Sequence, residues 1–308
     1  MKDDYVVVDE PISEETGSFF LERYRKINPA VTFDTKIRPQ ALRVNTLRTT
    51  PEELIKQLNR RGALLEKIAF LKVGYFIRSS FSAGATPEYL FGHYYLQAPL
   101  SQLTCEALAP TKDATILDMA SAPGGKTTYL AQMAPDGMVV ALDNDMHRLA
   151  TVRNNVERLG FLNVVCIKKD ARFAKDLGMQ FDFVLLDAPC SGNFCSEDGW
   201  FGKRTIQDIK NNARVQRELI KSAYDCLKPG GRMVYSTCSL EPEEDEMVVD
   251  YALKKFSDLT VVPFDPSIGD PGTVTWEGPL DHRIAGTRRF WPHKTGLEGF
   301  YIAVLEKR

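Results

Sequence analysis

The sequence predicts an α/β fold with a parallel sheet in the larger, C-terminal part of the 308-residue chain. Beyond about residue 110, short apolar strands alternate with helical segments, which is typical of a parallel sheet covered by helices on both faces. A glycine-rich turn, Ala120 to Thr127, follows the first of these strands, where such folds bind ligands. We therefore expect a small α+β domain over residues 1-110 and an α/β domain over residues 111-308.

Residues 13 to 27 predict the first helix, because Ser13 can cap its start and apolar residues recur at helical spacing. Pro51 and Gly62 bound a second helix, since proline favours the first turn and glycine follows the last. The elements expected after the first helix are a strand over 41–47, a helix over 51–61, a strand over 64–71 and a helix over 99–108.

The C-terminal part predicts seven strands with helices between them. The strands are expected over 114–119, 138–143, 164–168, 183–187, 233–237, 259–263 and 299–306. The helices are expected from 126, over 146–159, over 206–227 and from 242. The acidic run from Glu241 to Glu246 would form the first turn of the last helix, where the helix dipole favours negative charge.

The composition predicts a soluble protein. Hydrophobic residues make up 44% of the chain and charged residues 26%, and no apolar run approaches the roughly 18 residues that span a bilayer. The N-terminus carries acids where an export signal needs bases, and the six cysteines form no CxxC pair. We expect a cytoplasmic monomer with no membrane partner and no metal.

Basic residues gather in two stretches although the net charge is −2. Between Lys36 and Arg78, Lys and Arg outnumber acids, which suits a phosphate-contacting face; a solvated helix surface explains the same pattern. After Asp281, cations interleave with Phe290 and Trp291, which suits stacking on single-stranded bases. The candidate nucleic-acid contacts are Arg43, Arg60, Arg61, Arg288, Arg289 and His293.

The glycine-rich turn is ambiguous between two classes of ligand. It differs from the phosphate-binding GxxxxGK[ST] pattern only by Ala120 in place of glycine, so a nucleotide hydrolase is one alternative. Against it, Asp118 ends the preceding strand, Pro123 removes an amide donor, and Asp143 ends the next strand. A strand-end carboxylate suits a ribose diol. A ligand with a ribose, an adenine and a cationic arm fits these acids, and S-adenosylmethionine is such a ligand.

In this interpretation Asp143 holds the ribose, Asp170 faces the adenine amino group and Asp118 lies near the sulfonium. A helix or loop cap is the alternative role for each single acid. The candidate cofactor-binding residues are Asp118, Ala120, Ser121, Ala122, Pro123, Gly124, Gly125, Lys126, Asp143, Arg148, Asp170 and Asp187.

Two cysteines stand at the ends of predicted strands. Cys190 lies in Asp187-Ala-Pro-Cys-Ser-Gly, and Cys238 lies in Ser236-Thr-Cys-Ser. A cysteine is usually a small buried hydrophobe, but these two have polar or proline neighbours at the sheet edge where α/β folds place chemistry. The pattern predicts thiol chemistry beside a bound cofactor.

These motifs, together with Arg43-Val-Asn-Thr-Leu and Arg289-Phe-Trp-Pro-His, resemble the RNA cytosine carbon-5 methyltransferases of the NOL1/NOP2/Sun family. Where members of that family often have Cys-Ala-Ala before Pro-Gly-Gly-Lys-Thr, this chain has Ala120-Ser121-Ala122. The resemblance implies a class I, Rossmann-like, seven-strand S-adenosylmethionine-dependent methyltransferase domain over residues 111-308. It also implies an RNA-recognition-like, RNA-binding domain over residues 1-110.

The implied chemistry requires a thiolate that adds to carbon 6 of cytosine, so that carbon 5 can attack a methyl group. The family assigns addition to the cysteine matching Cys238 and product release to the one matching Cys190; the residues alone leave this order open. Asp187 would hydrogen-bond the base, and Lys126 would lower a thiol pKa or contact the base, unless it is a solvent-facing lysine at a helix start.

The expected substrate is an unpaired or flipped cytosine in structured RNA, with tRNA favoured over rRNA. A P-loop nucleotidase and a noncatalytic RNA-binding factor are the alternatives to this reading of the sequence.

Overall fold

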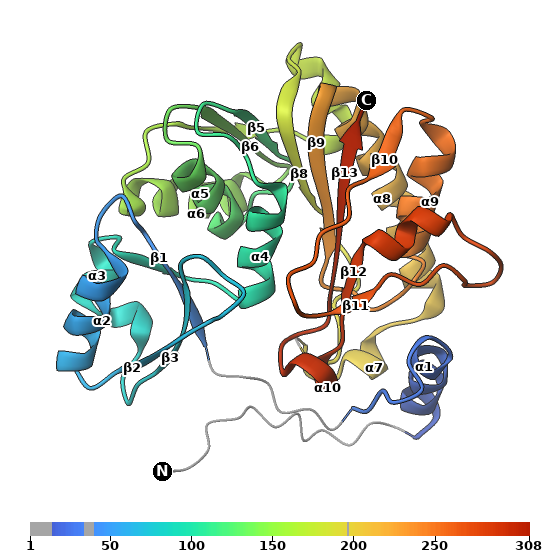
Figure 1. Ribbon diagram of the computed structural model, residues 1–308, viewed down its shortest axis with the longest axis horizontal. Helices are drawn as coiled ribbons and strands as arrows, with labels where there is room; N and C mark the ends of the chain where they lie inside the picture. The colour runs from blue at the N-terminus through green and yellow to red at the C-terminus, as the bar shows by residue number, and fades with distance from the viewer. Residues whose placement is uncertain (1–13, 34–39, 196) are drawn as a thin grey trace. The chain divides into compact units, whose positions relative to one another are not determined.

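The computed structural model describes residues 14–33, 40–195 and 197–308 (Figure 1). The chain divides into two compact units. We call residues 39–185 and 225–232 the glycine-turn unit, and residues 1–38, 186–224 and 233–308 the cysteine unit. The domain boundary expected near residue 110 falls inside the glycine-turn unit and stays a prediction. The predicted cap Ser13 lies outside the described residues.

A small antiparallel sheet occupies the first part of the glycine-turn unit. Its strands are β1 (Ala41–Val44), β2 (Leu64–Lys67), β3 (Gly74–Arg78) and β4 (Tyr94–Leu96), in the order β2-β3-β1-β4. The helices beside it are α2 (Pro51–Arg60), η1 (Ala83–Ala85), α3 (Pro87–Leu90) and α4 (Pro99–Leu108). Thr50 caps α2 by accepting from the Glu53 amide, and Leu54 and Leu58 pack under the sheet. The sequence missed β3, which separates β1 from β2.

The strands of the glycine-turn unit that follow are parallel. They are β5 (Thr115–Asp118), β6 (Met138–Asp143), β7 (Val164–Lys168) and β8 (Phe181–Asp187), in the order β8-β5-β6-β7. The helices that connect them are α5 (Gly125–Met133), α6 (Met146–Leu159) and the 3-10 helix η2 (Ala171–Leu177). The four strands and the helices α5 and α6 lie close to their predicted ranges, because strands and helices differ clearly in hydrophobic period, whereas η2 was not predicted.

The strands of the cysteine unit pair in the order β11-β12-β13-β9, and β10 pairs with β13. They are β9 (Leu227–Thr237), β10 (Leu259–Val261), β11 (Asp270–Pro271), β12 (Arg288–Phe290) and β13 (Phe300–Lys307). Both β8 and β9 begin in the glycine-turn unit and end in the cysteine unit. The described part of the chain therefore has nine strands after residue 110, two more than the sequence predicted.

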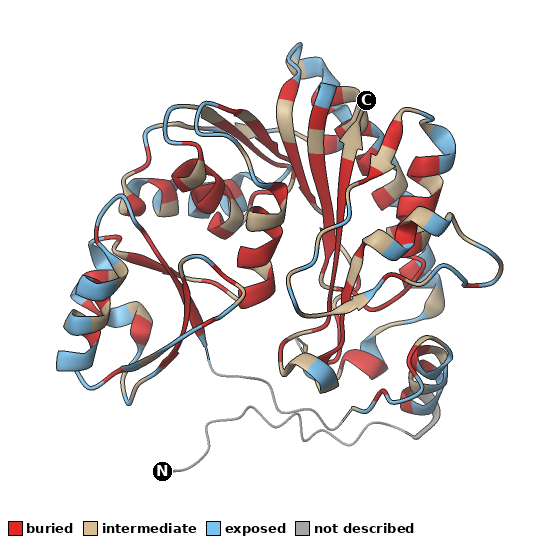
Figure 2. Cartoon of the chain, in the orientation of Figure 1, coloured by how far each residue is buried: buried red, intermediate tan, exposed pale blue. Residues whose placement is uncertain are grey.

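The helices of this unit are α1 (Glu14–Ile27), α7 (Trp200–Lys203), α8 (Ile206–Cys226), α9 (Glu246–Lys255), η3 (His282–Gly286) and α10 (Pro292–Thr295). As Figure 2 shows, the strands are largely buried and the helices expose one side. The last long helix, α9, begins at Glu246, four residues later than predicted. The preceding acids are buried rather than solvated at a helix start.

An aromatic cluster joins α1 to the C-terminal part of the cysteine unit. The Phe20 ring lies 4.7 Å from the Trp200 ring, and the Tyr24 ring lies 5.9 Å from the Trp291 ring. Phe290 is 0% and Trp291 1% exposed. The prediction that these two aromatics stack on bases is therefore wrong: they are core residues. Among the described helices, none is long and apolar enough to cross a membrane.

Trp291→Ala should lower the free energy of unfolding by about 3–5 kcal/mol, because a fully buried indole leaves a cavity. Chemical denaturation measures the change, and Val215→Ala, at a position 36% exposed on α8, serves as the control with a change within about 0.5 kcal/mol. An unchanged stability together with weakened RNA binding would restore the base-stacking interpretation.

Candidate active site

The glycine-rich turn has a backbone that only glycine fits. Gly124 has φ of 105°, in the left-handed region, and precedes the first residue of α5. A Cβ on Gly125 would come within 2.9 Å of the Tyr95 ring. The Ser121 amide donates to the Leu142 carbonyl at 2.8 Å, which ties the turn to β6. The turn therefore lies at the carboxyl ends of β5 and β6, as the sequence predicted.

Buried polar groups line this turn. Asp118 is 1% exposed, and its Oδ2 accepts the Thr127 hydroxyl at 2.6 Å. Thr127 was not among the candidate residues, although it is the third residue of α5 and its hydroxyl reaches back to the strand end. Ser121 Oγ is buried without a hydrogen-bond partner among the described residues. Because such a hydroxyl usually has a partner, the turn fits a bound polar ligand.

The other predicted acids also lie at strand ends. Asp143 is 4% exposed; its Oδ1 accepts from the Asp145 amide at 2.9 Å, and its Oδ2 lies 3.8 Å from Arg148 Nη2. Asp170 caps η2, and hydrogen bonds from the Arg172 side chain lower its pKa. Asp170 thus has the capping role that the sequence allowed, and the cofactor contacts of both acids stay predictions.

Arg43 is fully buried and does not form a surface for RNA. Its guanidinium donates to the Gly125 carbonyl at 2.8 Å and to Thr128 Oγ1 at 3.0 Å, and thereby joins β1 to the start of α5. Burial lowers its pKa to about 10. The predicted contact of Arg43 with RNA is corrected to a structural role. In the sequence, the indication of that role was an arginine placed inside an apolar strand. Lys126 Nζ lies 3.2 Å from Ser101 Oγ, a contact to α4.

The cysteine unit brings together the two predicted thiols. Cys190 and Cys238 follow the ends of β8 and β9, and their Sγ atoms are 3.1 Å apart. Both residues are half-buried. The Ala188 amide donates to the Ser236 carbonyl at 2.8 Å, and the Ser236 hydroxyl donates to Asp187 Oδ1 at 2.7 Å. Adjacent strand ends thus place Asp187 and both thiols in one region.

The thiol of Cys190 holds its proton strongly. Its hydrogen bond with Cys238 and then its burial raise its pKa well above the ordinary value of 9.0. A neutral thiol in contact with a second sulfur can donate its proton there or receive one from it. The pair can therefore exchange a proton without a third group.

Two arginines form ion pairs with the buried acids that follow Cys238. Arg23 Nη2 lies 2.8 Å from both Glu241 and Glu243, and the Tyr24 hydroxyl donates to Glu241 at 2.6 Å. Arg289 is 0% exposed and binds Glu246 through two nitrogens and Asp245 at 3.2 Å. Arg289 is therefore an internal ion-pair partner, and its predicted contact with RNA is corrected.

The remaining candidate RNA contacts differ in exposure. Arg60 is exposed, and Arg61 pairs with Glu88 at 3.0 Å. The Arg288 side chain is 15% exposed and donates to the Thr287 carbonyl, while His293 lies 3.4 Å from the Asn28 amide nitrogen. Burial lowers the pKa of His293, so it is neutral near pH 7. RNA contacts by these four residues stay predictions, and Lys36 lies outside the described residues.

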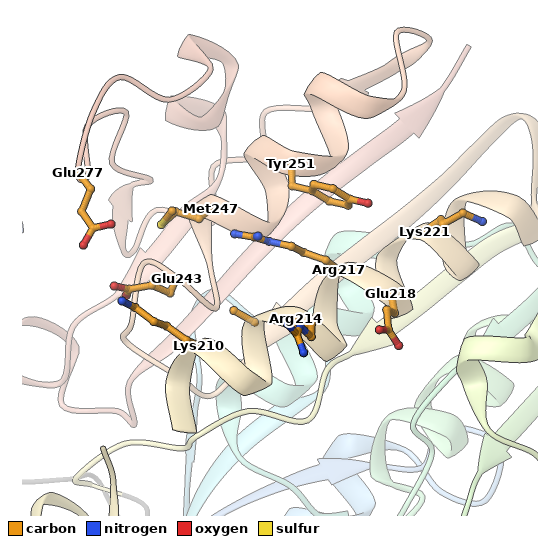
Figure 3. A pocket seen from close by; sticks show the side chains of 10 residues that line it. Lys210, Arg214, Arg217, Glu218, Lys221, Glu243, Met247, Tyr251 and Glu277 are labelled. Atoms are coloured by element: carbon orange, nitrogen blue, oxygen red, sulfur yellow. The ribbon is translucent and has the colours of Figure 1, made fainter. Parts of the chain in front are cut away.

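A pocket of about 510 Å³ lies in the cysteine unit against α8 and α9 (Figure 3). Arg217 extends beside the Tyr251 ring, 5.6 Å from its centroid. Acids from three segments, Glu218, Glu243 and Glu277, also line it, so its charge is mixed. None of its lining residues is a predicted site residue. Within the described ranges, no group of His, Cys, Asp and Glu has the arrangement of a metal site.

Iodoacetamide should label Cys190 slowly near neutral pH and faster as the pH passes 9.0, because only the thiolate reacts and Cys238 raises the pKa of this thiol. Mass spectrometry of the peptide gives the rate. Cys238→Ala removes the neighbouring sulfur and should raise the labelling rate of Cys190 at a given pH. Rapid labelling of wild-type Cys190 at neutral pH would contradict the raised pKa.

Comparison with known proteins agrees with this arrangement. Residues 105–306 match the family described as 16S rRNA methyltransferase RsmB/F, and residues 20–99 match the N-terminal domain of 16S rRNA methyltransferase RsmF. A crystal structure of a methyltransferase homolog from Pyrococcus horikoshii is 40% identical with a TM-score of 0.81, covering 88% of this chain and 87% of that one. The predicted methyltransferase fold class is thereby confirmed.

Two relatives differ in how much of their length is shared. The 28S rRNA (cytosine-C(5))-methyltransferase of Mus musculus is 42% identical over 88% of this chain, but the chain spans only 35% of the mouse protein. The tRNA (cytosine(49)-C(5))-methyltransferase of Pyrococcus abyssi is 35% identical over 93% of this chain and 95% of its own length. From the family matches and these identities, the chain belongs to the RsmB/F methyltransferase family.

Proposed function

We propose that the chain is an RNA (cytosine-5)-methyltransferase that forms 5-methylcytosine in structured RNA, with tRNA as its substrate. The observation that carries the proposal is the pair of thiols, Cys190 and Cys238, 3.1 Å apart at adjacent strand ends. The choice of tRNA rests on the Pyrococcus abyssi relative, which is named for tRNA and matches this chain over nearly its whole length. An rRNA substrate is the alternative outcome. We further propose that the protein acts as a cytoplasmic monomer.

The proposed reaction begins when the Cys238 thiolate adds to carbon 6 of an unpaired cytosine. The addition gives carbon 5 the electron density to form a new carbon–carbon bond. The proton on carbon 5 then passes to water by way of Cys190, its bonding electrons restore the ring double bond, and the bond from carbon 6 to sulfur breaks to regenerate the Cys238 thiolate. Cys190, beside Cys238, assists this release, and Asp187 would orient the base by hydrogen bonding.

S-adenosylmethionine, when bound, supplies an electrophilic methyl group. The glycine-rich turn suits this ligand because glycine lets the backbone approach it closely and Ser121 Oγ lacks a partner among the described residues. Asp143 would hold the ribose through its carboxylate. Asp170 and Asp118 keep their proposed places at the adenine and near the sulfonium.

Replacing each thiol tests the mechanism, because the two variants should fail at different steps. Cys238→Ala should abolish transfer of labelled methyl groups to tRNA, since no thiolate adds to the base. Cys190→Ala should accumulate a protein–RNA adduct that survives denaturing electrophoresis, since release is blocked. Cys195→Ala, a half-buried cysteine of the same unit, is the matched control and should retain turnover. Normal turnover in both of the first two variants would overturn the thiol mechanism, whereas RNA binding without methyl transfer by the wild-type protein would leave a noncatalytic RNA-binding role.

Calorimetry tests the cofactor. The protein should bind S-adenosylmethionine and not ATP, and Asp143→Ala should weaken that binding about 10- to 100-fold, because a buried carboxylate loses its hydrogen bonds to the ribose. Asp176→Asn, whose side chain is 68% exposed, should bind as the wild type does. Binding of ATP alone would favour the nucleotidase.

A further inference from the structure

One buried carboxylate contacts the loops of both thiols. Glu244 lies between β9 and α9 and is 0% exposed. It accepts from the Ser191 amide at 3.0 Å and from the Ser191 hydroxyl at 2.6 Å. Ser191 directly follows Cys190, so these two bonds fix the backbone just beyond the first thiol.

The same carboxylate reaches the second loop. The Ser239 side chain also hydrogen-bonds Glu244, and Ser239 directly follows Cys238. The hydroxyls of Ser191 and Ser239 are themselves 3.3 Å apart. Glu244 thus lies at the centre of a hydrogen-bonded group that joins the chain beyond Cys190 to the chain beyond Cys238.

The partners of Glu244 distinguish it from the neighbouring acids. Glu241 pairs with Arg23 and Glu246 with Arg289, whereas Glu244 receives bonds from serines and from Asn212. Burial raises the pKa of Glu244, and these donors act against that effect. A buried charge adds little stability compared with an apolar residue of similar volume, but it imposes strict geometry on its donors. The Glu244 carboxylate and its donors therefore determine the position of the two loops.

We propose that Glu244 is a positioning residue that holds the Cys190 and Cys238 loops together, so that both sulfurs lie beside the same cytosine ring. The proposal rests on the thiol roles given under the proposed function. Glu244 would act through Ser191 and Ser239, the residues that directly follow the two thiols.

The charge of Glu244 allows a second test of the proposal, through its effect on the pKa of Cys190. The groups that raise the pKa of Cys190 are Cys238 and then Glu244, and the buried Tyr235 hydroxyl interacts electrostatically with Cys190 as well. Replacing the Glu244 carboxylate by an uncharged amide should therefore lower the pKa of Cys190. A purely structural substitution elsewhere in the acidic run should not.

Glu244→Gln and Glu241→Gln form a matched pair, because both remove one buried carboxylate from the same segment. Glu244→Gln should lower kcat for tRNA methylation about 10- to 100-fold with KM changed less than about twofold, as expected when reacting groups are misplaced by a fraction of an ångström. Glu241→Gln loses contacts to Arg23 and Tyr24 and should lower thermal stability with little change in kcat. Ser191→Ala, which keeps the amide donor, should lower kcat in the same direction by less.

Alkylation of Cys190 is measured as a function of pH in the Cys238→Ala background, which needs no methyl transfer. Adding Glu244→Gln should move the midpoint to lower pH, and adding Glu241→Gln should leave it in place. Equal losses of kcat in the two glutamine variants, or an unmoved midpoint, would overturn the proposal. If Glu244→Gln fails to fold, the combined Ser191→Ala and Ser239→Ala variant, which keeps the carboxylate but removes both hydroxyl donors, should lower kcat with KM changed less than about twofold, and an unchanged kcat would overturn the proposal. If instead Cys238 proves dispensable for methylation, the proposed function fails while the midpoint still tests the placement of Glu244.

Discussion

The pairing of the ends of β8 and β9 is the constraint on which the thiol chemistry depends. The hydrogen bond from the Ala188 amide to the Ser236 carbonyl aligns the last residues of the two strands. Each strand then runs directly into its cysteine motif, so two residues separated by 48 positions in the sequence bring their sulfurs within 3.1 Å. Neither loop needs to be long, because the sheet itself does the positioning.

The buried charged segment that follows Cys238 stabilises this alignment. Residues 241–246 carry acids that are fastened by Arg23 from α1 and Arg289 from β12. Removing one partner from such a buried pair costs about 3–5 kcal/mol, because the remaining charge stays in a poorly solvated place. The two arginines thus connect the first described helix and a late strand to the segment immediately after Cys238. Within this segment Glu244 is oriented toward the thiol loops, while its neighbours serve the ion pairs.

Much of the fold could be predicted from the sequence, because strand and helix periods are local properties. The strands β5 to β8 and the helices α5 and α6 follow from alternation alone, and the glycine turn follows from Gly124. Burial of charge could not be predicted in this way. Arg289 next to Trp291 looks like a nucleic-acid contact, because its acidic partner Glu246 lies 43 residues earlier in the chain. The short pairing of β11 with β12 is also non-local, because it joins Asp270 to Arg289.

The candidate site likewise has a part that could be predicted from the sequence and a part that could not. The strand-end acids and both cysteines could be found, since parallel strands collect their carboxyl ends at one edge. The order of the two thiols could not, because either one can in principle add to the base, and the assignment of Cys238 comes from the family resemblance. Glu244 was hidden among neighbouring acids that suggested a helix start. The sequence did hold one indication of Glu244, because the run from Glu241 to Glu246 has more acids than a single helix terminus needs.

Arg43 has a mechanical consequence for the glycine-turn unit. Two hydrogen bonds, to the Gly125 carbonyl and the Thr128 hydroxyl, run from the middle of β1 to the first turn of α5. A displacement of the small sheet is therefore passed directly to the helix that carries the turn, without slack from a flexible connection. The position of the glycine-rich turn therefore depends on the small antiparallel sheet through Arg43, as well as on β6 through the Ser121 amide.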